Sequence, residues 1–205
     1  AYIPLFMCMI VPLTITLLQK LSITVMLDTN MDAFKQKLRD AGFKGDLDDS
    51  ASAKDFYSHD ASLFEIVPEL VVFPKDVEDV LMLVKVARQE KKHIPNLSLT
   101  GRSAGTDMAG GAINDSVIVD FTRYINKIRS VSKSKAVAEP GVFYRDFEKK
   151  TLKYNALMPT YPASRDLAAL GGMVNNDSGG EKSLEYGKTA DFVEELKVVF
   201  VDGIE

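Results

Sequence analysis

The segment of residues 100–111 reads Thr-Gly-Arg-Ser-Ala-Gly-Thr-Asp-Met-Ala-Gly-Gly and constrains the fold of this 205-residue chain more than any other feature. Apolar segments flank it at Ile94–Leu99 and Val117–Val119, which predicts a strand, a glycine-rich turn and a second strand. Glycine permits positive φ angles, and a backbone with few side chains can point several N–H groups at one ligand. Together with its hydroxyls and its one arginine, the turn is typical of a site for a phosphate-rich ligand.

Two common phosphate-binding motifs do not fit this turn. The dinucleotide fingerprint Gly-x-Gly-x-x-Gly opens a helix, whereas the glycines here have another spacing and lead into a strand. The P-loop requires Gly-Lys-Ser/Thr, but Gly105 is followed by Thr106 and Asp107. A plain turn between two strands is the simpler alternative, although it needs fewer glycines.

A second glycine-rich region strengthens the ligand hypothesis. Residues 170–180 read Leu-Gly-Gly-Met-Val-Asn-Asn-Asp-Ser-Gly-Gly, and the wider region 162–187 is rich in Gly, Asn and Ser. Paired glycines beside amides and hydroxyls favour close approach of a backbone to a polar or flat ligand. The alternative is an irregular surface loop, but long ordered loops in compact domains are usually functional.

The rest of residues 65–205 alternates strand and helix patterns. Apolar residues at helical spacing follow residue 77, with Asp76 placed to cap the helix and Asp79 to complete a capping box, so we predict a well-buried helix that ends near Lys91. We predict strands at Leu70–Phe73, Ile94–Leu99, Val117–Asp120, Ile128–Val131, Ala136–Ala138 and Val198–Val201, and a further helix at Phe143–Tyr154.

The N-terminal residues 1–64 divide into two segments. Residues 1–30 form an apolar extension that reads as a membrane anchor or signal-like segment, as a buried element, or as translation upstream of a true start at Met26 or Met31. We favour upstream translation because a basic leader and a small-residue cleavage site are missing. Residues 31–64 predict a lead-in helix and a loop, in which His59 is either functional or a surface residue.

Composition narrows the chemistry further. The net charge of −4 argues against a nucleic-acid partner. A single cysteine excludes an internal disulfide, and one Cys with two His is too few for a Cys/His metal cluster, so we expect no metal. Redox chemistry, if present, is therefore expected from an organic cofactor. The Asp202-Gly203 hairpin signal after an apolar run suggests that the domain is truncated at its C-terminus.

The two glycine-rich regions, with Val72-Phe73-Pro74 before them and Ala138-Glu139-Pro140-Gly141-Val142 between them, resemble the FAD-binding domain of the vanillyl-alcohol oxidase / p-cresol methylhydroxylase flavoprotein family. The similarity is greatest to its D-lactate and glycolate dehydrogenase branch and covers residues 50–205. It implies an α+β fold of the PCMH type, with two α/β subdomains and FAD between them. Residues 65–205 would form this domain.

The resemblance also implies which residues hold the cofactor. On the diphosphate side these are Arg102, Ser103, Ala104, Gly105, Thr106, Asp107, Gly110 and Gly111, and on the flavin side Ser164, Gly171, Gly172, Asn176, Gly179 and Gly180. The backbone would hold the diphosphate, the side chains of Thr106 and Asp107 would add contacts, and the Arg102 side chain is also expected to face it. Asp177 is expected to point away from the flavin. The loop has no His for a covalent link, so we expect non-covalent FAD. Catalytic residues cannot be named.

The function implied is that of the FAD-binding part of a dehydrogenase that takes hydride from a 2-hydroxy acid such as D-lactate or glycolate and passes electrons to a quinone or an electron-transfer protein. We expect this part to be inactive by itself. The alternatives are a non-catalytic flavin-carrying subunit and an enzyme like UDP-N-acetylenolpyruvoylglucosamine reductase. We expect a cytoplasmic protein, with membrane contact only through residues 1–30.

Overall fold

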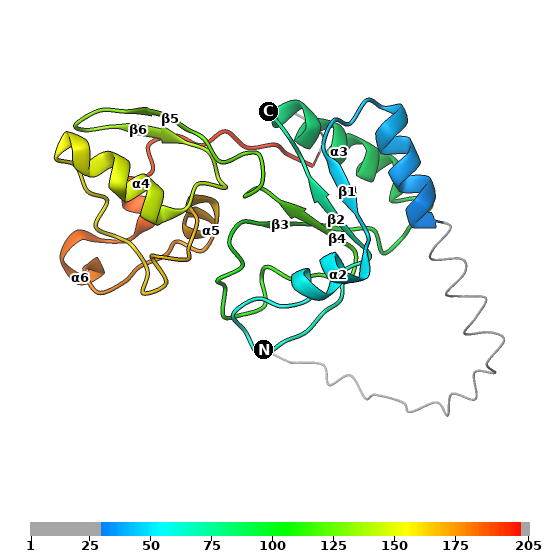
Figure 1. Cartoon of the computed structure of the whole chain (residues 1–205), viewed down its shortest axis with the longest axis horizontal. Helices are drawn as coiled ribbons and strands as arrows, with labels where there is room; N and C mark the ends of the chain where they lie inside the picture. Colours follow the sequence, from blue (N-terminus) through cyan, green and yellow to red (C-terminus); the bar gives the residue numbers. More distant parts are fainter. Residues whose placement is uncertain (1–29, 202–205) are drawn as a thin grey trace, which may run out of the picture.

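The computed structural model describes residues 30–201, and these residues form two parts that lie side by side (Figure 1). The first part contains a four-stranded sheet, and the second contains a two-stranded sheet with short helices. The expectations for residues 1–29 and for the hairpin turn at Asp202-Gly203 lie outside the described residues.

The larger sheet is mixed and has the strand order β1-β2-β4-β3. Its strands are β1 (Asp46–Asp48), β2 (Leu70–Phe73), β3 (Leu99–Arg102) and β4 (Val117–Asp120). β1 is antiparallel to β2, whereas β2, β4 and β3 run parallel. Arg102 at the end of β3 pairs in register with Asp120 at the end of β4, so the glycine-rich loop leaves the sheet at its carboxyl edge.

Both faces of this sheet are buried, which explains the continuous apolar runs in β2 and β4. The helix of residues 30–40 and α3 (Val77–Glu90) pack in the core cluster on one face, while α2 (Ala51–Tyr57) packs on the other. Alternation along the strands divides the core, since Leu70 and Val72 belong to the first cluster and Val71 and Phe73 to the second.

The second part is built around β5 (Ile128–Val131) and β6 (Ala136–Ala138), which pair antiparallel. Its helices are α4 (Tyr144–Thr151), continued by the 3-10 turn Leu152–Tyr154, then α5 (Leu170–Asn175), α6 (Ser183–Tyr186) and the 3-10 turn Thr189–Phe192. Tyr144, Phe147, Tyr161 and Met173 form its buried centre. The Tyr144 hydroxyl donates to the main-chain carbonyl of Met158 at 2.6 Å.

Most of the predicted elements are confirmed. β2, β4, β5 and β6 have the predicted bounds, and the predicted helix at Phe143–Tyr154 is α4 with its 3-10 continuation. Two shorter elements, β1 and α2, were not predicted. They lie within residues 31–64, in the segment that was expected to be a loop. Likewise α5 and α6 lie within the irregular region of residues 162–187.

The strand expected at Ile94–Leu99 is wrong in position, since β3 begins at Leu99. Ile94 N–H donates to the Glu90 carbonyl at 2.8 Å and Leu97 N–H donates to the Ile94 carbonyl at 2.9 Å, so these residues turn away from α3. Ile94 and Leu97 are nevertheless buried in the first core cluster. Their apolar character therefore reflects burial in a turn rather than a strand.

The strand expected at Val198–Val201 is also wrong. Within the described residues, the segment 193–201 has no strand partner, and Leu196 and Phe200 are more than half exposed. The segment runs from the second part back towards the first (Figure 1). An open hollow of about 410 Å³ is lined by Leu196, Lys197, Val198 and Phe200, and none of these is a predicted site residue.

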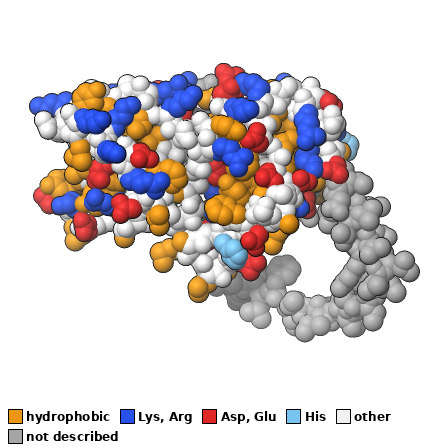
Figure 2. Space-filling view, viewed as in Figure 1, with side chains coloured by type: hydrophobic (Ala, Val, Ile, Leu, Met, Phe, Trp, Pro, Cys, Tyr) orange, Lys and Arg blue, Asp and Glu red, His pale blue; other side chains and the backbone are white. Residues whose placement is uncertain are grey.

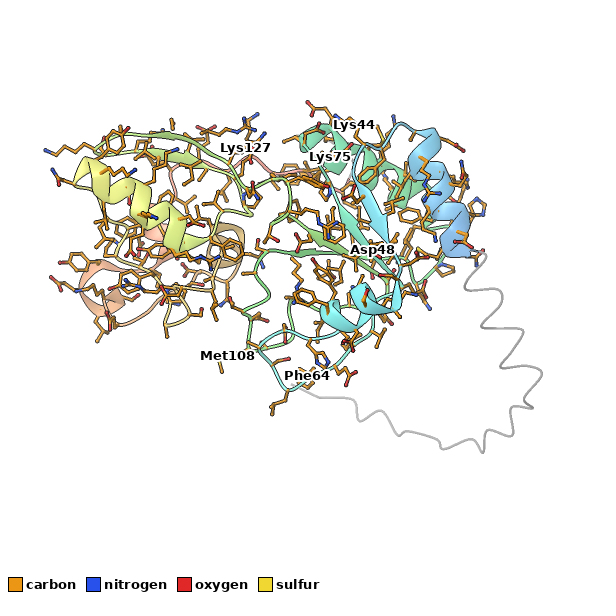
Figure 3. All side chains as sticks on the ribbon, in the orientation of Figure 1. Lys44, Asp48, Phe64, Lys75, Met108 and Lys127 are labelled. Atoms are coloured by element: carbon orange, nitrogen blue, oxygen red, sulfur yellow. The ribbon has the colours of Figure 1, made fainter. Side chains whose placement is uncertain are left out.

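Helix α3 begins as predicted, but Asp79 does not have the role in the capping box that was expected of it. Asp76 caps the helix by accepting the Asp79 N–H at 3.0 Å. The fully buried Asp79 carboxylate does not complete a capping box, and instead accepts the N–H groups of Lys44 at 3.0 Å and Lys75 at 2.9 Å. Lys44 and Lys75 lie close together above β1 (Figure 3). Asp79 therefore joins two turns that are distant in sequence.

The surface carries mixed charges. Lys and Arg side chains alternate with Asp and Glu over the face shown in Figure 2. Among residues 30–201, no helix is long and apolar enough to span a lipid bilayer.

Candidate cofactor site

The glycine-rich loop is shaped by its own side chains and by positive φ angles. Gly105 has φ +67° and Gly110 has φ +84°, a conformation that favours glycine. The Asp107 carboxylate accepts the N–H of Gly111 at 2.6 Å and that of Ala109 at 3.3 Å. Asp107 was expected to contact the cofactor through its side chain, but in the structure this carboxylate closes the tip of the loop.

The Arg102 side chain lies beneath the loop. It is only 7% exposed, and its Nη1 donates to the carbonyls of His59 at 2.7 Å and Ala112 at 3.1 Å. Burial lowers the pKa of this guanidinium from its ordinary value, while the nearby charge of Asp120 acts in the opposite direction. The Arg102 Nη1 faces main-chain carbonyls and the side chain is buried, so the expectation that this side chain faces a diphosphate stays a prediction that this geometry does not favour.

The main-chain amides of the loop beside Arg102 have no hydrogen-bond partner in the part of the chain that the structure describes. Within residues 30–201, the main-chain N–H groups of Ala104, Gly105 and Thr106 donate no hydrogen bond, and the Thr106 hydroxyl makes none either. Successive amides without partners in a partly exposed loop can serve as donors to an anionic ligand. This arrangement fits the phosphate-binding role predicted for the loop.

The two glycine-rich regions meet at Pro140. The Pro140 carbonyl accepts the Ser103 hydroxyl at 3.2 Å and the Gly171 N–H at 2.8 Å. A Cβ added to Gly171 would lie 2.6 Å from the Pro140 Cβ and 2.7 Å from the Ser103 Oγ. Gly171 is therefore required for the contact between the first loop and the start of α5. The sequence shows Ala138–Val142 only as a segment between the two glycine-rich regions, and it does not predict that they meet at Pro140.

Gly172, the next residue, faces open space. Apart from the backbone of its own helix and its chain neighbours, a Cβ added there would meet no atom of the described residues within 4 Å, and the residue is exposed. The packing of the described residues therefore gives no reason for glycine at this position. A ligand that lies against α5 would supply the reason, and this makes Gly172 the most informative of the predicted flavin-side residues.

The remaining predicted residues on the flavin side lie in the second part and have local roles. An added Cβ at Gly180 would stand 2.1 Å from the Tyr161 carbonyl oxygen, and one at Gly179 would stand 2.8 Å from the Ser183 Oγ. The Ser164 carbonyl accepts the N–H groups of the turn that leads to α5, and Asn176 is exposed at the C-terminal cap of α5. Within residues 30–201, none of these four residues makes a hydrogen bond to the first loop.

Gly110 and Gly111 lie at the opposite end of the loop from α5. An added Cβ at Gly110 would stand 3.0 Å from the Phe64 ring, and Phe64 and Met108 lie together at this tip (Figure 3). The packing and backbone shape of this tip therefore explain why Gly110 and Gly111 are glycines.

Two other candidate residues, Asp177 and His59, make their contacts away from Pro140, where the two glycine-rich regions meet. The Asp177 carboxylate accepts the Ala190 N–H at 2.9 Å and lies 3.8 Å from the Lys188 Nζ, so its charge is directed towards residues 188–190. The His59 side chain is exposed near Glu65, while its carbonyl binds Arg102. Neither this carbonyl nor Tyr57, whose ring centroid lies 5.1 Å from the Arg102 guanidinium, could be recognised from a sequence motif.

Comparison with known proteins identifies similar sequences. A family model described as an FAD binding domain matches residues 68–204. D-2-hydroxyglutarate dehydrogenase of Escherichia coli is 33% identical over 83% of this chain and 17% of its own length. The glycolate oxidase subunit GlcD of Bacillus subtilis is 25% identical over 82% of this chain and 36% of its own length. D-lactate dehydrogenase of Anaerostipes hadrus is 30% identical over 66% of this chain and 28% of its own length.

Solved structures show the same fold. Alkyldihydroxyacetonephosphate synthase matches with a TM-score of 0.66 and 26% identity over 78% of this chain and 32% of that chain. The 6-hydroxy-D-nicotine oxidase of Arthrobacter nicotinovorans matches with a TM-score of 0.66 and 21% identity over 80% of this chain and 35% of that chain, which shows the fold alone. The chain thus spans about a third or less of the length of most of these proteins.

Proposed function

Because the chain belongs to the FAD-binding domain family, we propose that it holds FAD between its two parts and forms the flavin-binding portion of a dehydrogenase that oxidises a 2-hydroxy acid. The observation that carries the proposal is the meeting of the two glycine-rich regions at the Pro140 carbonyl, with the unpartnered amides of Ala104–Thr106 on one side and the open face of Gly172 on the other.

The residues at this meeting point would bind two different parts of FAD, its diphosphate and its flavin side. The amides of Ala104, Gly105 and Thr106 would hold the diphosphate as neutral donors, with the Thr106 hydroxyl beside them. Gly171 and Gly172 would let the flavin side of the cofactor approach the backbone of α5 closely. Bound FAD would supply the hydride acceptor, and the task of this chain is to bind and orient it.

We propose that the cofactor is held without a covalent bond. The two histidines of the chain, His59 and His93, lie in neither glycine-rich region. His59 carries its side chain beside Glu65, outside the loop that would face the diphosphate. Release of intact FAD from acid-precipitated protein would support this, and flavin that remains attached to the precipitate would contradict it.

The substrate proposal rests on the relatives. The matching dehydrogenases are named for D-2-hydroxyglutarate and D-lactate, and another relative is a glycolate oxidase subunit, so the shared substrate class is a 2-hydroxy acid. We propose a quinone or an electron-transfer protein as the electron acceptor and a cytoplasmic location. A non-catalytic flavin-carrying subunit is the alternative, favoured by the absence of an assigned catalytic base among the described site residues.

Titration with FAD tests the cofactor proposal. The purified chain should quench flavin fluorescence and shift the visible flavin bands saturably, and ADP should compete because it shares the diphosphate. Protein that leaves the FAD spectrum unchanged would refute FAD binding. A second step adds 2-hydroxy acids under anaerobic conditions to the FAD-loaded protein. Bleaching by one of them supports the dehydrogenase and contradicts the expectation that this part is inactive by itself, whereas bound FAD that stays oxidised agrees with that expectation and with the flavin-carrying subunit alike.

A further inference from the structure

We propose that Arg102 is a positioning residue of the cofactor site, whose buried guanidinium holds the loop of residues 103–112 in its binding shape without touching the cofactor. The inference rests on the proposed FAD-binding function and deepens it. In this proposal the buried side chain beneath the loop keeps the amides of Ala104, Gly105 and Thr106, which have no partner among the described residues, pointing at the cofactor.

The contacts of one guanidinium nitrogen join three stretches of chain. Arg102 stands where β3 enters the loop, and its Nη1 binds the carbonyl of Ala112, where the loop ends. The same nitrogen binds the carbonyl of His59, which follows α2. The entrance and the exit of the loop are therefore tied to each other and to the segment beside α2. Hydrogen bonds from a charged donor are stronger than those between neutral groups.

The guanidinium is itself fixed in place from below. The Tyr57 ring lies 5.1 Å from it, and the Tyr57 hydroxyl donates to the Asp120 carboxylate at 3.0 Å. Asp120 is the residue that pairs in register with Arg102 across β3 and β4. Stacking on an aromatic ring and a planar set of donors are properties of arginine that lysine lacks.

The loop wraps over this side chain at Gly105. A Cβ added there would stand 2.4 Å from the Arg102 Nη2, and the φ of +67° already favours glycine. The Gly105 backbone therefore rests directly on the guanidinium, with its own amide unpartnered. Arg102 acts through this backbone rather than through a direct contact, because its exposed fraction is only 7%.

The segment beside α2 gives the loop a second attachment, which can report on its shape. Ala61 N–H donates to the Asp107 carbonyl at 3.0 Å, and Gly111 N–H donates to the Asp107 carboxylate at 2.6 Å. If Arg102 holds the loop, loosening it should break these bonds more often even when no cofactor is present. Hydrogen exchange at these two amides measures that opening.

The test compares Arg102→Lys with Arg123→Lys. Arg123 is a matched control because its guanidinium also packs on an aromatic ring, Phe73, at 3.4 Å, and pairs with Asp46 instead of the loop. For Arg102→Lys we expect faster exchange at the Ala61 and Gly111 amides in the FAD-free protein and a Kd for FAD raised about tenfold or more. For Arg123→Lys we expect neither change.

Two results would overturn the inference. Weaker FAD binding with unchanged exchange would show that Arg102 contacts the cofactor directly, and unchanged FAD binding would show that its hold on the loop is irrelevant to the site. If Arg102→Lys fails to fold, Tyr57→Phe takes its place, since it keeps the ring but removes the bond to Asp120, and the same two readouts should move several-fold. Wild-type protein that binds no FAD would refute the proposed function instead, while exchange would still report the hold on the loop.

Discussion

Replacing Gly172 by alanine separates a cofactor contact from a structural role. Beyond its own helix, an added Cβ meets no atom of residues 30–201 within 4 Å, so this part of the fold has room for the methyl group. Gly172 lies inside the short helix α5, where alanine is favoured over glycine by up to about 1 kcal/mol. Because α5 has only six residues, we expect about half of this, which corresponds to a rise in Tm of roughly 1–2 °C for a domain of this size.

Cofactor binding should change in the opposite direction. If FAD lies in contact with the Gly172 backbone, the methyl group occupies part of its place, and overpacking of this kind costs about 1–3 kcal/mol. The Kd for FAD should therefore rise by roughly 5- to 150-fold. Gly171→Ala is the contrasting variant, because its Cβ would approach Pro140 within 2.6 Å and should lower the Tm as well.

Differential scanning fluorimetry and fluorescence titration with FAD give the two readouts on the same samples. The reasoning predicts a Gly172→Ala protein that is at least as stable as wild type but binds FAD more weakly. Wild-type affinity in this variant would refute the placement of FAD against α5. A clear loss of stability in the FAD-free protein would refute the conclusion that the position is open.

Other substitutions test the packing around the site by urea unfolding. Gly180→Ala should lower the free energy of unfolding by about 2 kcal/mol or more, since its Cβ would stand 2.1 Å from the Tyr161 carbonyl oxygen, and an unchanged midpoint would contradict this close approach. Tyr144→Phe should lower it by about 1–2 kcal/mol, because the Met158 main-chain carbonyl, which is partly buried, loses its donor; a loss below the error of the assay would argue that water replaces it. The hydroxyl of Tyr124, with Arg123 adding to it, lowers the pKa of Asp46 below its ordinary value of 3.8. The ionised carboxylate therefore stabilises the fold above pH 3.8 and this contribution disappears as the pH falls through the folded-state pKa. Asp46→Asn should cost less than about 1 kcal/mol at pH 7 because the pair is exposed, and its difference from wild type should shrink towards pH 3, whereas a constant difference would show that the charge is not responsible.

The sequence predicted those elements whose local signal agrees with their place in the fold. β2 and the first three residues of β4 are continuous apolar runs, and the structure buries every residue of both strands. β3 was placed too early, because Leu99–Arg102 contains a threonine, a glycine and an arginine and is a strand only through its parallel pairing with β4. α5 was hidden by its paired glycines, which disfavour a helix locally.

In the candidate site, too, the features set by neighbouring residues could be predicted, whereas those set by contacts between distant segments could not. Backbone features of the first loop followed from its glycines, since Gly105 and Gly110 do have positive φ angles. The role of the Arg102 side chain could not be predicted, because its acceptors are main-chain carbonyls, one of them at His59, which carry no signal in the side-chain sequence. The importance of Pro140 likewise arises only when both parts of the molecule are folded.

The buried carboxylate of Asp79 has a consequence for where this domain should be cut. The family match begins at residue 68, but one of the two N–H donors to Asp79 comes from Lys44, and Phe34 and Leu38 are fully buried in the first core cluster. A shortened chain that starts at residue 68 would expose the apolar face of α3 and leave Asp79 with a missing donor. The stretch that the family model matches is thus smaller than the stretch that folds, and a boundary drawn from that model would pass through a hydrophobic core.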